Sequence, residues 1–279
     1  MDPSTHTFRG SRYYGLLQQR VGRRNRVDDM PFVVFFDCES DCTFQSAAGG
    51  NRSEAFTRMQ ATVVCALVID TEQCEKVTGR STALSAAKEK HWWRDQAESG
   101  KGPFNELLKL FDEADCIVAF NGIDFDLPLL RKHYGSSKRG MKRYLDHRIK
   151  CHDPFVKIRT ATDVWFKLDV LLRANGLPTK TGTGLEAIRM WENGEREKLK
   201  SYCAQDVRSL VALTLLERLE APNVGSLPNH VHGITSALAG IKALRSVPVE
   251  EEFVIVREER IGEEPRRSYA EVAETVAVR

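Results

Sequence analysis

The sequence has no long apolar segment. No stretch of its 279 residues approaches the ~18 consecutive apolar residues that a membrane-spanning helix needs. Internal repeats and low-complexity tracts are absent as well. With 42% hydrophobic and 29% charged residues, the composition is that of an ordinary globular chain that can bury a substantial core. We therefore expect a soluble protein with one main domain and no association with a membrane.

Cysteine pairs with the spacing of a disulfide framework or a structural zinc site are also missing. The seven cysteines are odd in number and scattered through apolar or helical segments, which is typical of reduced thiols. Cys38 and Cys42 lack the second ligand pair that a zinc site requires. This cysteine usage predicts an intracellular protein, either cytoplasmic or nuclear.

A large net charge is missing too, since the formal net charge is only +2. Positive residues are nevertheless concentrated in an N-terminal arm and in the run 137–143. Either run could contact phosphates, and the alternative for each is a solvated surface segment. The segment 181–184 lacks the glycine and lysine pattern of a P-loop, so we interpret it as a turn and a helix N-cap.

Two carboxylates, Asp37 and Glu39, stand directly after the apolar run 32–36. In a strand, residues i and i+2 point to the same face, so both acids would be aimed at one point. Two like charges so close repel each other unless a cation or a proton lies between them. Because ligands gather at the carboxyl ends of buried strands, a divalent metal is the first hypothesis.

The apolar periodicity predicts strands and helices in alternation, which is typical of an α/β domain. Strands are expected at 32–36, 62–69 and 116–120, with weaker candidates near Lys76 and near Phe155. A polar loop is expected over 43–58, and helices over 103–114, 125–134, 166–174, 184–192 and 195–220. The less regular chain past Ala221 contains a helical pattern at 234–245 and a strand-like run at 253–256.

Two further segments supply acids. The predicted strand that ends at Asn121 is followed by Asp124-Phe125-Asp126, again at the carboxyl end of a core strand. In the last long helix, Tyr202 and Asp206 lie at positions i and i+4 and therefore on one face. Each group also has an ordinary structural explanation, namely a helix N-cap, a first-turn acid or an amphipathic helix. Four acids and a phenol together suit two divalent cations.

These segments resemble the motifs of the DEDD 3′-to-5′ exonucleases, in the tyrosine-bearing (DEDDy) subgroup of the ribonuclease H-like superfamily. The matching pieces are Phe36–Glu39, Asn121–Asp126 and Tyr202–Asp206, and the resemblance spans residues 32 to about 220. In that family the second acid follows an aromatic residue, which selects Asp126 over Asp124. The resemblance implies an α/β fold, a mixed five-stranded sheet with helices on both faces and with its second strand antiparallel to the others.

The resemblance also implies roles for the acids in a centre with two ions of Mg²⁺ or Mn²⁺. Asp37, Glu39 and Asp206 would hold the ion that activates water. Asp37 and Asp126 would hold the ion that faces the leaving 3′ oxygen, so that Asp37 bridges both. Tyr202 would orient the attacking water, because a phenol with a pKa near 10 is a poor base at neutral pH.

The implied reaction is hydrolysis of the phosphodiester at the 3′ end of a single-stranded nucleic acid, RNA or DNA, with release of nucleoside 5′-monophosphates. Asn121, Lys180 and Arg139 are predicted to contact this substrate, since they lie near the acids in the sequence pattern. Four tryptophans could stack on unpaired bases, but packing is the favoured role of each: Trp92, Trp93, Trp165 and Trp191. The alternative is an inactive exonuclease-like module that binds nucleic acid or protein.

The resemblance divides the chain into three parts. Residues 1–29 are expected to form a flexible basic arm, and residues 30–222 the exonuclease domain. Residues 223–279 are expected to form a C-terminal extension whose role the sequence does not indicate.

Overall fold

The computed structural model describes residues 32–70, 87–96, 102–179 and 182–234. The predicted basic arm, the strand candidate near Lys76, the residue Lys180 and the elements predicted beyond Ile234 lie outside this part. The domain limits therefore stay predictions.

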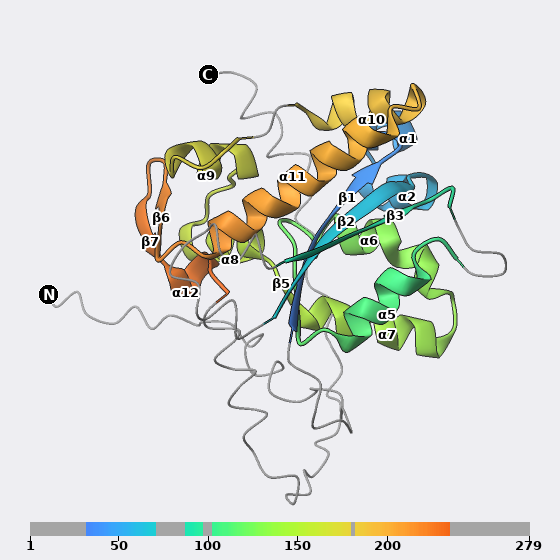
Figure 1. The fold of residues 1–279 in the computed structure, drawn as a ribbon, viewed down its shortest axis with the longest axis horizontal. Coiled ribbons are helices and arrows are strands. Elements are labelled where there is room, and N and C mark those ends of the chain that lie inside the picture. Colours follow the sequence, from blue (N-terminus) through green and yellow to red (C-terminus); the bar gives the residue numbers. More distant parts are fainter. Residues whose placement is uncertain (1–31, 71–86, 97–101, 180–181, 235–279) are drawn as a thin grey trace, which may run out of the picture. The chain divides into compact units, whose positions relative to one another are not determined.

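Five strands form one mixed sheet in the order β3-β2-β1-β4-β5, and Figure 1 shows β3, β2 and β1 side by side. They are β1 (Phe32–Ser40), β2 (Ala61–Asp70), β3 (Lys88–Trp93), β4 (Cys116–Val118) and β5 (Cys151–His152). β2 is antiparallel to both of its neighbours, whereas β1, β4 and β5 are mutually parallel. This strand order and these directions confirm the predicted ribonuclease H-like α/β fold.

Strand β1 is central because its side chains are apolar on both faces. Val33 and Phe35 belong to the core under helix α11 (Arg196–Thr214), whereas Val34 and Phe36 belong to the core under α5 (Asn105–Glu113). All four side chains are completely buried. Burial on both faces explains why β1 is an unbroken apolar run up to its first acid.

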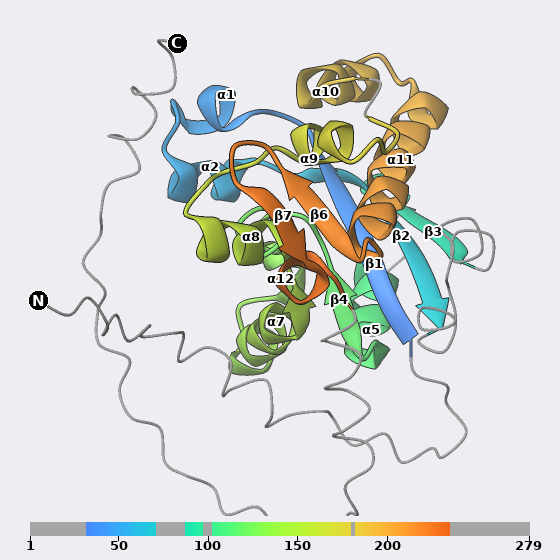
Figure 2. The same cartoon turned by 90° about the vertical axis from the view of Figure 1, so that its left-hand side faces the viewer.

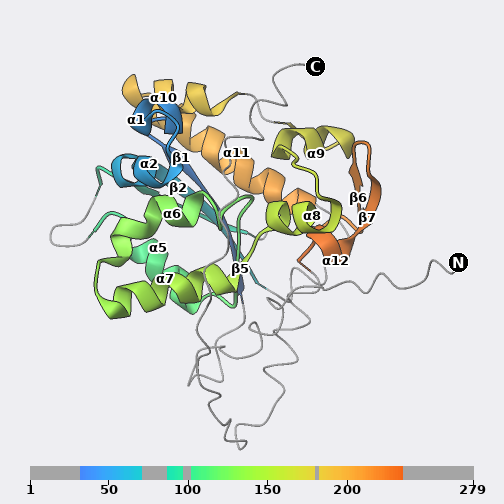
Figure 3. The same ribbon diagram turned by 180° about the vertical axis from the view of Figure 1, so that it is seen from behind.

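Helices cover both faces of the sheet (Figures 1 and 3). Helix α11 lies across one face, where it contacts β1 and β2, and α10 (Gly184–Glu192) packs beside it. The other face carries α5, α6 (Asp126–Leu130), the short 3₁₀ helix η2 (Arg131–Tyr134) and α7 (Lys138–Lys150). The prediction of helix 184–192 is confirmed, and Thr183 forms a capping box with Glu186 at its start.

A third apolar cluster lies at the C-terminal half of α11. It joins α8 (Pro154–Thr162) and α9 (Leu168–Ala174) to a hairpin of β6 (Arg218–Ala221) and β7 (Gly225–Pro228), and Figure 2 shows these elements. The short helix α12 (Asn229–His232) follows β7 and packs on α8. The described chain past residue 222 thus packs against the elements that precede it.

The predicted polar loop at 43–58 is wrong, because this segment contains α1 (Phe44–Ala48) and α2 (Arg52–Arg58). The side chains of Thr43 and Asn51 cap the two helices. Helix α1 has five residues and α2 has seven, and such short helices cannot be distinguished from a loop by their apolar periodicity.

Two other local predictions are also wrong. The candidate strand near Phe155 is helix α8, which starts at Pro154 after the N-cap residue Asp153. The helix predicted to end at residue 220 ends at Thr214, because the residues of β6 pair with β7 instead. Periodicity alone cannot show where the helix ends. Here its end is set by the pairing of β6 with β7, which outweighs the local helical pattern.

None of the helices within the described ranges has the length and apolar character to cross a bilayer.

A polar chain that runs from a buried to a partly exposed position joins α7 to α5. The Tyr134 hydroxyl lies 2.9 Å from Nδ1 of His147, whose Nε2 lies 2.8 Å from Oδ1 of Asp112. The Arg143 guanidinium donates to both carboxylate oxygens of Asp112, at 2.8 and 2.6 Å. Partial burial raises the pKa of Asp112, but the hydrogen bonds from His147 and Arg143 prevail and lower it to about 2.

The substitution Asp112→Asn should lower the free energy of unfolding at pH 7 by about 0.5–1 kcal/mol, a figure discounted because this side chain is half exposed. The native pKa lies below the usual 3.8, so this contribution is complete above about pH 4 and is lost as the pH falls towards 2. Urea unfolding at pH 7, 4 and 3 should show the difference from the unsubstituted protein shrinking. The exposed i,i+4 pair of Asp146 and Lys142 supplies the control, Asp146→Asn. An Asp112→Asn effect that is independent of pH would contradict the assignment.

Candidate functional site

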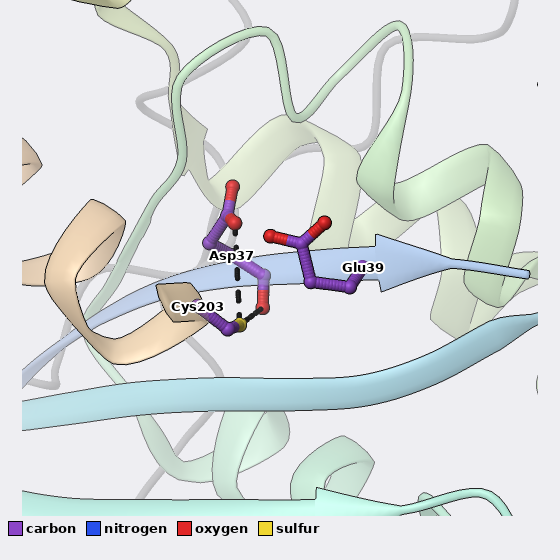
Figure 4. A group of neighbouring side chains, drawn as sticks. All are labelled: Asp37, Glu39 and Cys203. Atoms are coloured by element: carbon purple, nitrogen blue, oxygen red, sulfur yellow. Dashed lines mark hydrogen bonds between the residues drawn. The ribbon is translucent and has the colours of Figure 1, made fainter. Parts of the chain in front are cut away.

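The carboxyl end of β1 carries the first two candidate ligands. Asp37 and Glu39 project from the same side of the strand, as the i, i+2 spacing predicts (Figure 4). One ligand atom from each of Asp37, Glu39 and Cys203 lies within 4.8 Å of the others. Glu39 is buried and Asp37 is half-buried, so both acids are partly withdrawn from solvent.

Cys203 attaches α11 to the end of β1, and the sequence analysis did not select it as a site residue. Its thiol donates to the backbone carbonyl of Asp37 at 3.4 Å and lies 4.0 Å from Oδ2 of the same residue (Figure 4). Burial raises the pKa of the Cys203 thiol well above its usual value. The sulfur therefore stays protonated and acts as a donor that positions the strand, and its place inside the third motif was the available signal.

Asp126 comes from a different element and is held against the same strand end. It is the first residue of α6 and is buried. Its Oδ1 accepts the backbone N–H of Cys38 at 2.9 Å. Burial raises the pKa of Asp126 to about 7, although the N–H of Cys38 lowers it. A cation nearby would stabilise the ionised form of this carboxylate.

The five predicted catalytic residues line one open cavity of about 460 Å³: Asp37, Glu39, Asp126, Tyr202 and Asp206. Tyr202 and Asp206 are buried on the face of α11 that packs on the sheet. About half of the remaining lining residues are large and apolar: Phe44, Met59, Phe120, Phe125, Leu185 and Ile188. Three segments far apart in the sequence thus meet at the end of β1.

The predicted substrate-contact residues are placed differently. Asn121 follows β4 with a left-handed backbone, φ 64°, and its N–H donates to Asp153. Arg139 is exposed on α7, and neither residue lines the cavity within the described chain. Lys180 lies outside the described residues. The structure therefore brings the acids and Tyr202 together but not Asn121 and Arg139.

Asp153 is a structural acid that the sequence analysis missed. Its Oδ1 accepts the N–H of Asn121 at 2.9 Å, and its Oδ2 accepts the N–H of Ile123 at 3.0 Å. The same carboxylate caps α8 through the N–H groups of Phe155 and Val156. It therefore fixes the turn that leads from β4 to Asp126. The Asp-Pro step at 153–154, a common helix start, was the signal for it.

The donor set at this cavity fits divalent metal ions. Carboxylate oxygens are the ligands that Mg²⁺ and Mn²⁺ prefer, and four acids line the cavity. Asp37 and Glu39 hold like charges side by side, which a cation would stabilise. The residues that could hold metal are Asp37, Glu39, Asp126 and Asp206.

No protein-family model matches this sequence, and a search among curated proteins finds no match either. Among solved structures, the chain is similar to the family B DNA polymerase from the hyperthermophilic archaeon Pyrobaculum calidifontis. The TM-score is 0.44 and the sequence identity 15%, over 68% of this chain. The similarity covers 26% of the polymerase chain, so this protein spans only about a quarter of its length.

The substitution Asp153→Ala should lower the free energy of unfolding by about 2 kcal/mol, because it removes a helix cap and the acceptor for two turn N–H groups. It should also weaken Mn²⁺ binding, since the turn before Asp126 loses its anchor. Urea unfolding and a Mn²⁺ titration followed by electron paramagnetic resonance measure the two effects. Asp169→Ala, which removes a partly exposed first-turn acid of α9 that pairs with Arg173, serves as the control. Equal effects of both substitutions would rule out the anchoring role.

Proposed function

We propose that this protein is a metal-dependent 3′-to-5′ exonuclease of the DEDDy type, acting on single-stranded nucleic acid. The observation that carries the proposal is the convergence of Asp37, Glu39, Asp126, Tyr202 and Asp206 on one cavity. These residues come from β1, α6 and α11, so their proximity is a property of the fold and not of one local segment. The reaction is hydrolysis of the terminal phosphodiester, which releases nucleoside 5′-monophosphates.

Two bound Mg²⁺ or Mn²⁺ ions would supply stabilisation of both the attacking and the leaving oxygen of an in-line displacement at phosphorus. Glu39 and Asp206 would hold one ion together with Asp37, and Asp126 would hold the other together with Asp37. Asp37 is suited to the shared role, because it lies on the strand between the helix that carries Asp206 and the turn that carries Asp126.

Tyr202 orients the attacking water through its hydroxyl group. A phenol is a weak base at neutral pH, so orientation is the role that its chemistry favours. The tyrosine ring lines the cavity beside the acids, and its backbone belongs to the rigid helix α11. A hydroxyl held on a helix can direct one water molecule without moving during the reaction.

The apolar wall of the cavity supports a nucleic-acid substrate. Phe120 and Phe125 line the cavity and are suited to contact a terminal base, while metal held by the acids would contact its phosphate. Such a wall accepts an unpaired base, since stacking requires access to the face of the ring. Contacts of Asn121, Lys180 and Arg139 with the substrate stay predictions, as does the intracellular location.

The substitution Asp206→Asn should reduce the rate of mononucleotide release at least 100-fold in Mn²⁺ or Mg²⁺, because it removes a charged metal ligand. Release is measured by chromatography of products from a single-stranded oligonucleotide. Glu197→Gln, an exposed acid-to-amide change on the same helix, should leave the rate unchanged. Tyr202→Phe should lower kcat while retaining Mn²⁺ binding. An undiminished rate in Asp206→Asn would exclude the proposed centre, and binding without any metal-dependent turnover would favour the inactive module.

Direction and sugar preference can be tested with one substrate set. Matched RNA and DNA single strands labelled at the 5′ end should shorten by one nucleotide at a time and keep the label until the end. A chelator should stop the reaction, and added Mn²⁺ should restore it. Early release of the labelled nucleotide would contradict the 3′-to-5′ direction. The ratio of the hydrolysis rates of the RNA and DNA strands gives the preference of the enzyme for ribose or deoxyribose.

A further inference from the structure

Trp165 differs from the other tryptophans in its exposure. Its side chain is 54% exposed, whereas Trp92 and Trp93 are buried and Trp191 is covered by the guanidinium of Arg196 at 3.5 Å. It is the one aromatic residue among the large apolar side chains that the described chain exposes. The packing role predicted for Trp92 and Trp93 is therefore confirmed, and Trp165 requires a different explanation.

Neighbouring side chains hold the Trp165 indole in place. The guanidinium of Arg159 lies 4.5 Å from its ring centroid, and the Phe155 ring meets it edge-on at 5.2 Å. Arg159 and Phe155 both belong to α8, and Arg159 also lies 5.6 Å from the Phe155 ring. Its Nη1 is 3.8 Å from the carboxylate of Asp124. An exposed indole fixed in this way loses little conformational entropy when a ligand binds.

A line of aromatic rings connects Trp165 to the acid cavity. Phe155 contacts Phe120 with ring centroids 5.4 Å apart, and Phe120 lines the cavity beside Asp126. The rings therefore follow one another from the proposed reaction centre to an exposed surface. The spacing between ring centroids, 5.2 and 5.4 Å, makes each ring a direct neighbour of the next.

We propose that Trp165 is a stacking platform for an unpaired base of the substrate strand, upstream of the 3′ nucleotide in the acid cavity. Arg159, whose guanidinium lies over the indole and near the Phe155 ring, contacts the adjacent phosphate. An indole paired with a guanidinium offers a π face and a positive charge, the two features that bind single strands without regard to sequence. The proposal rests on the proposed exonuclease function, because it needs a strand whose end is in the cavity.

The test is binding of single-stranded oligonucleotides with one abasic position moved along the strand. The Asp206→Asn protein is used so that the strand stays intact, with 5′-labelled eight-nucleotide DNA and fluorescence anisotropy as the readout. One abasic position a few nucleotides from the 3′ end should weaken binding about tenfold, the effect of losing one stacked base. Adding Trp165→Ala should weaken binding of the intact strand about tenfold and abolish the response to that position. Trp165→Phe should restore part of both.

The matched control is Val164→Ala, which trims the exposed apolar neighbour of Trp165 and should change nothing. A Trp165→Ala protein that responds to the abasic position as before would overturn the proposal, even if mononucleotide release supports the exonuclease. An abasic response that depends on Trp165, in a protein that never releases mononucleotides, would support the platform and exclude the exonuclease. Absence of binding to any single strand would overturn both.

Discussion

Strand β1 is buried on both faces, and the position of every candidate site residue depends on this constraint. Its apolar residues pack into two separate hydrophobic cores, one under α11 and the other under α5 and α6. These cores enclose the apolar residues 33–36, and the acids Asp37 and Glu39 follow directly after them. At the acids α11 and α6 still contact the strand, through hydrogen bonds of Cys203 and Asp126. The location of the two acids follows from the burial of the residues that precede them.

A few hydrogen bonds then hold the other elements to the end of β1. The Cys38 N–H fixes Asp126, the Cys203 thiol fixes α11 through the Asp37 carbonyl, and Asp153 fixes the turn between β4 and α6. Each of these contacts pairs a side chain with a backbone group and is buried or partly buried, and only Asp126 among the four acids of the cavity gives a carboxylate oxygen to them. A site assembled in this way is positioned before any ligand binds, which is the condition for electrostatic catalysis.

The local pattern of apolar residues is sufficient to predict some of the helices and strands but not others. The buried runs of β1 and β2 and the amphipathic helices α5 and α10 were all predicted, because one residue pattern dominates each. The two-residue strand β5 and the short helices α1 and α2 were not, since each owes its structure to partners elsewhere in the chain. The predicted end of α11 is six residues too late for the same reason, because residues 218–221 form β6 and pair with β7.

The chemical groups of the site can be identified from the sequence: two acids after a buried strand, a third acid after the next core strand, and a phenol one helical turn from a fourth acid. Periodicity could also assign these groups to faces of strands and helices, since that depends only on local geometry. Only the tertiary structure decided that they share one cavity, that Cys203 and Asp153 support them, and that Arg139 and Asn121 do not line the wall. Those outcomes depend on how the layers pack, and packing is set by contacts between residues far apart in the chain.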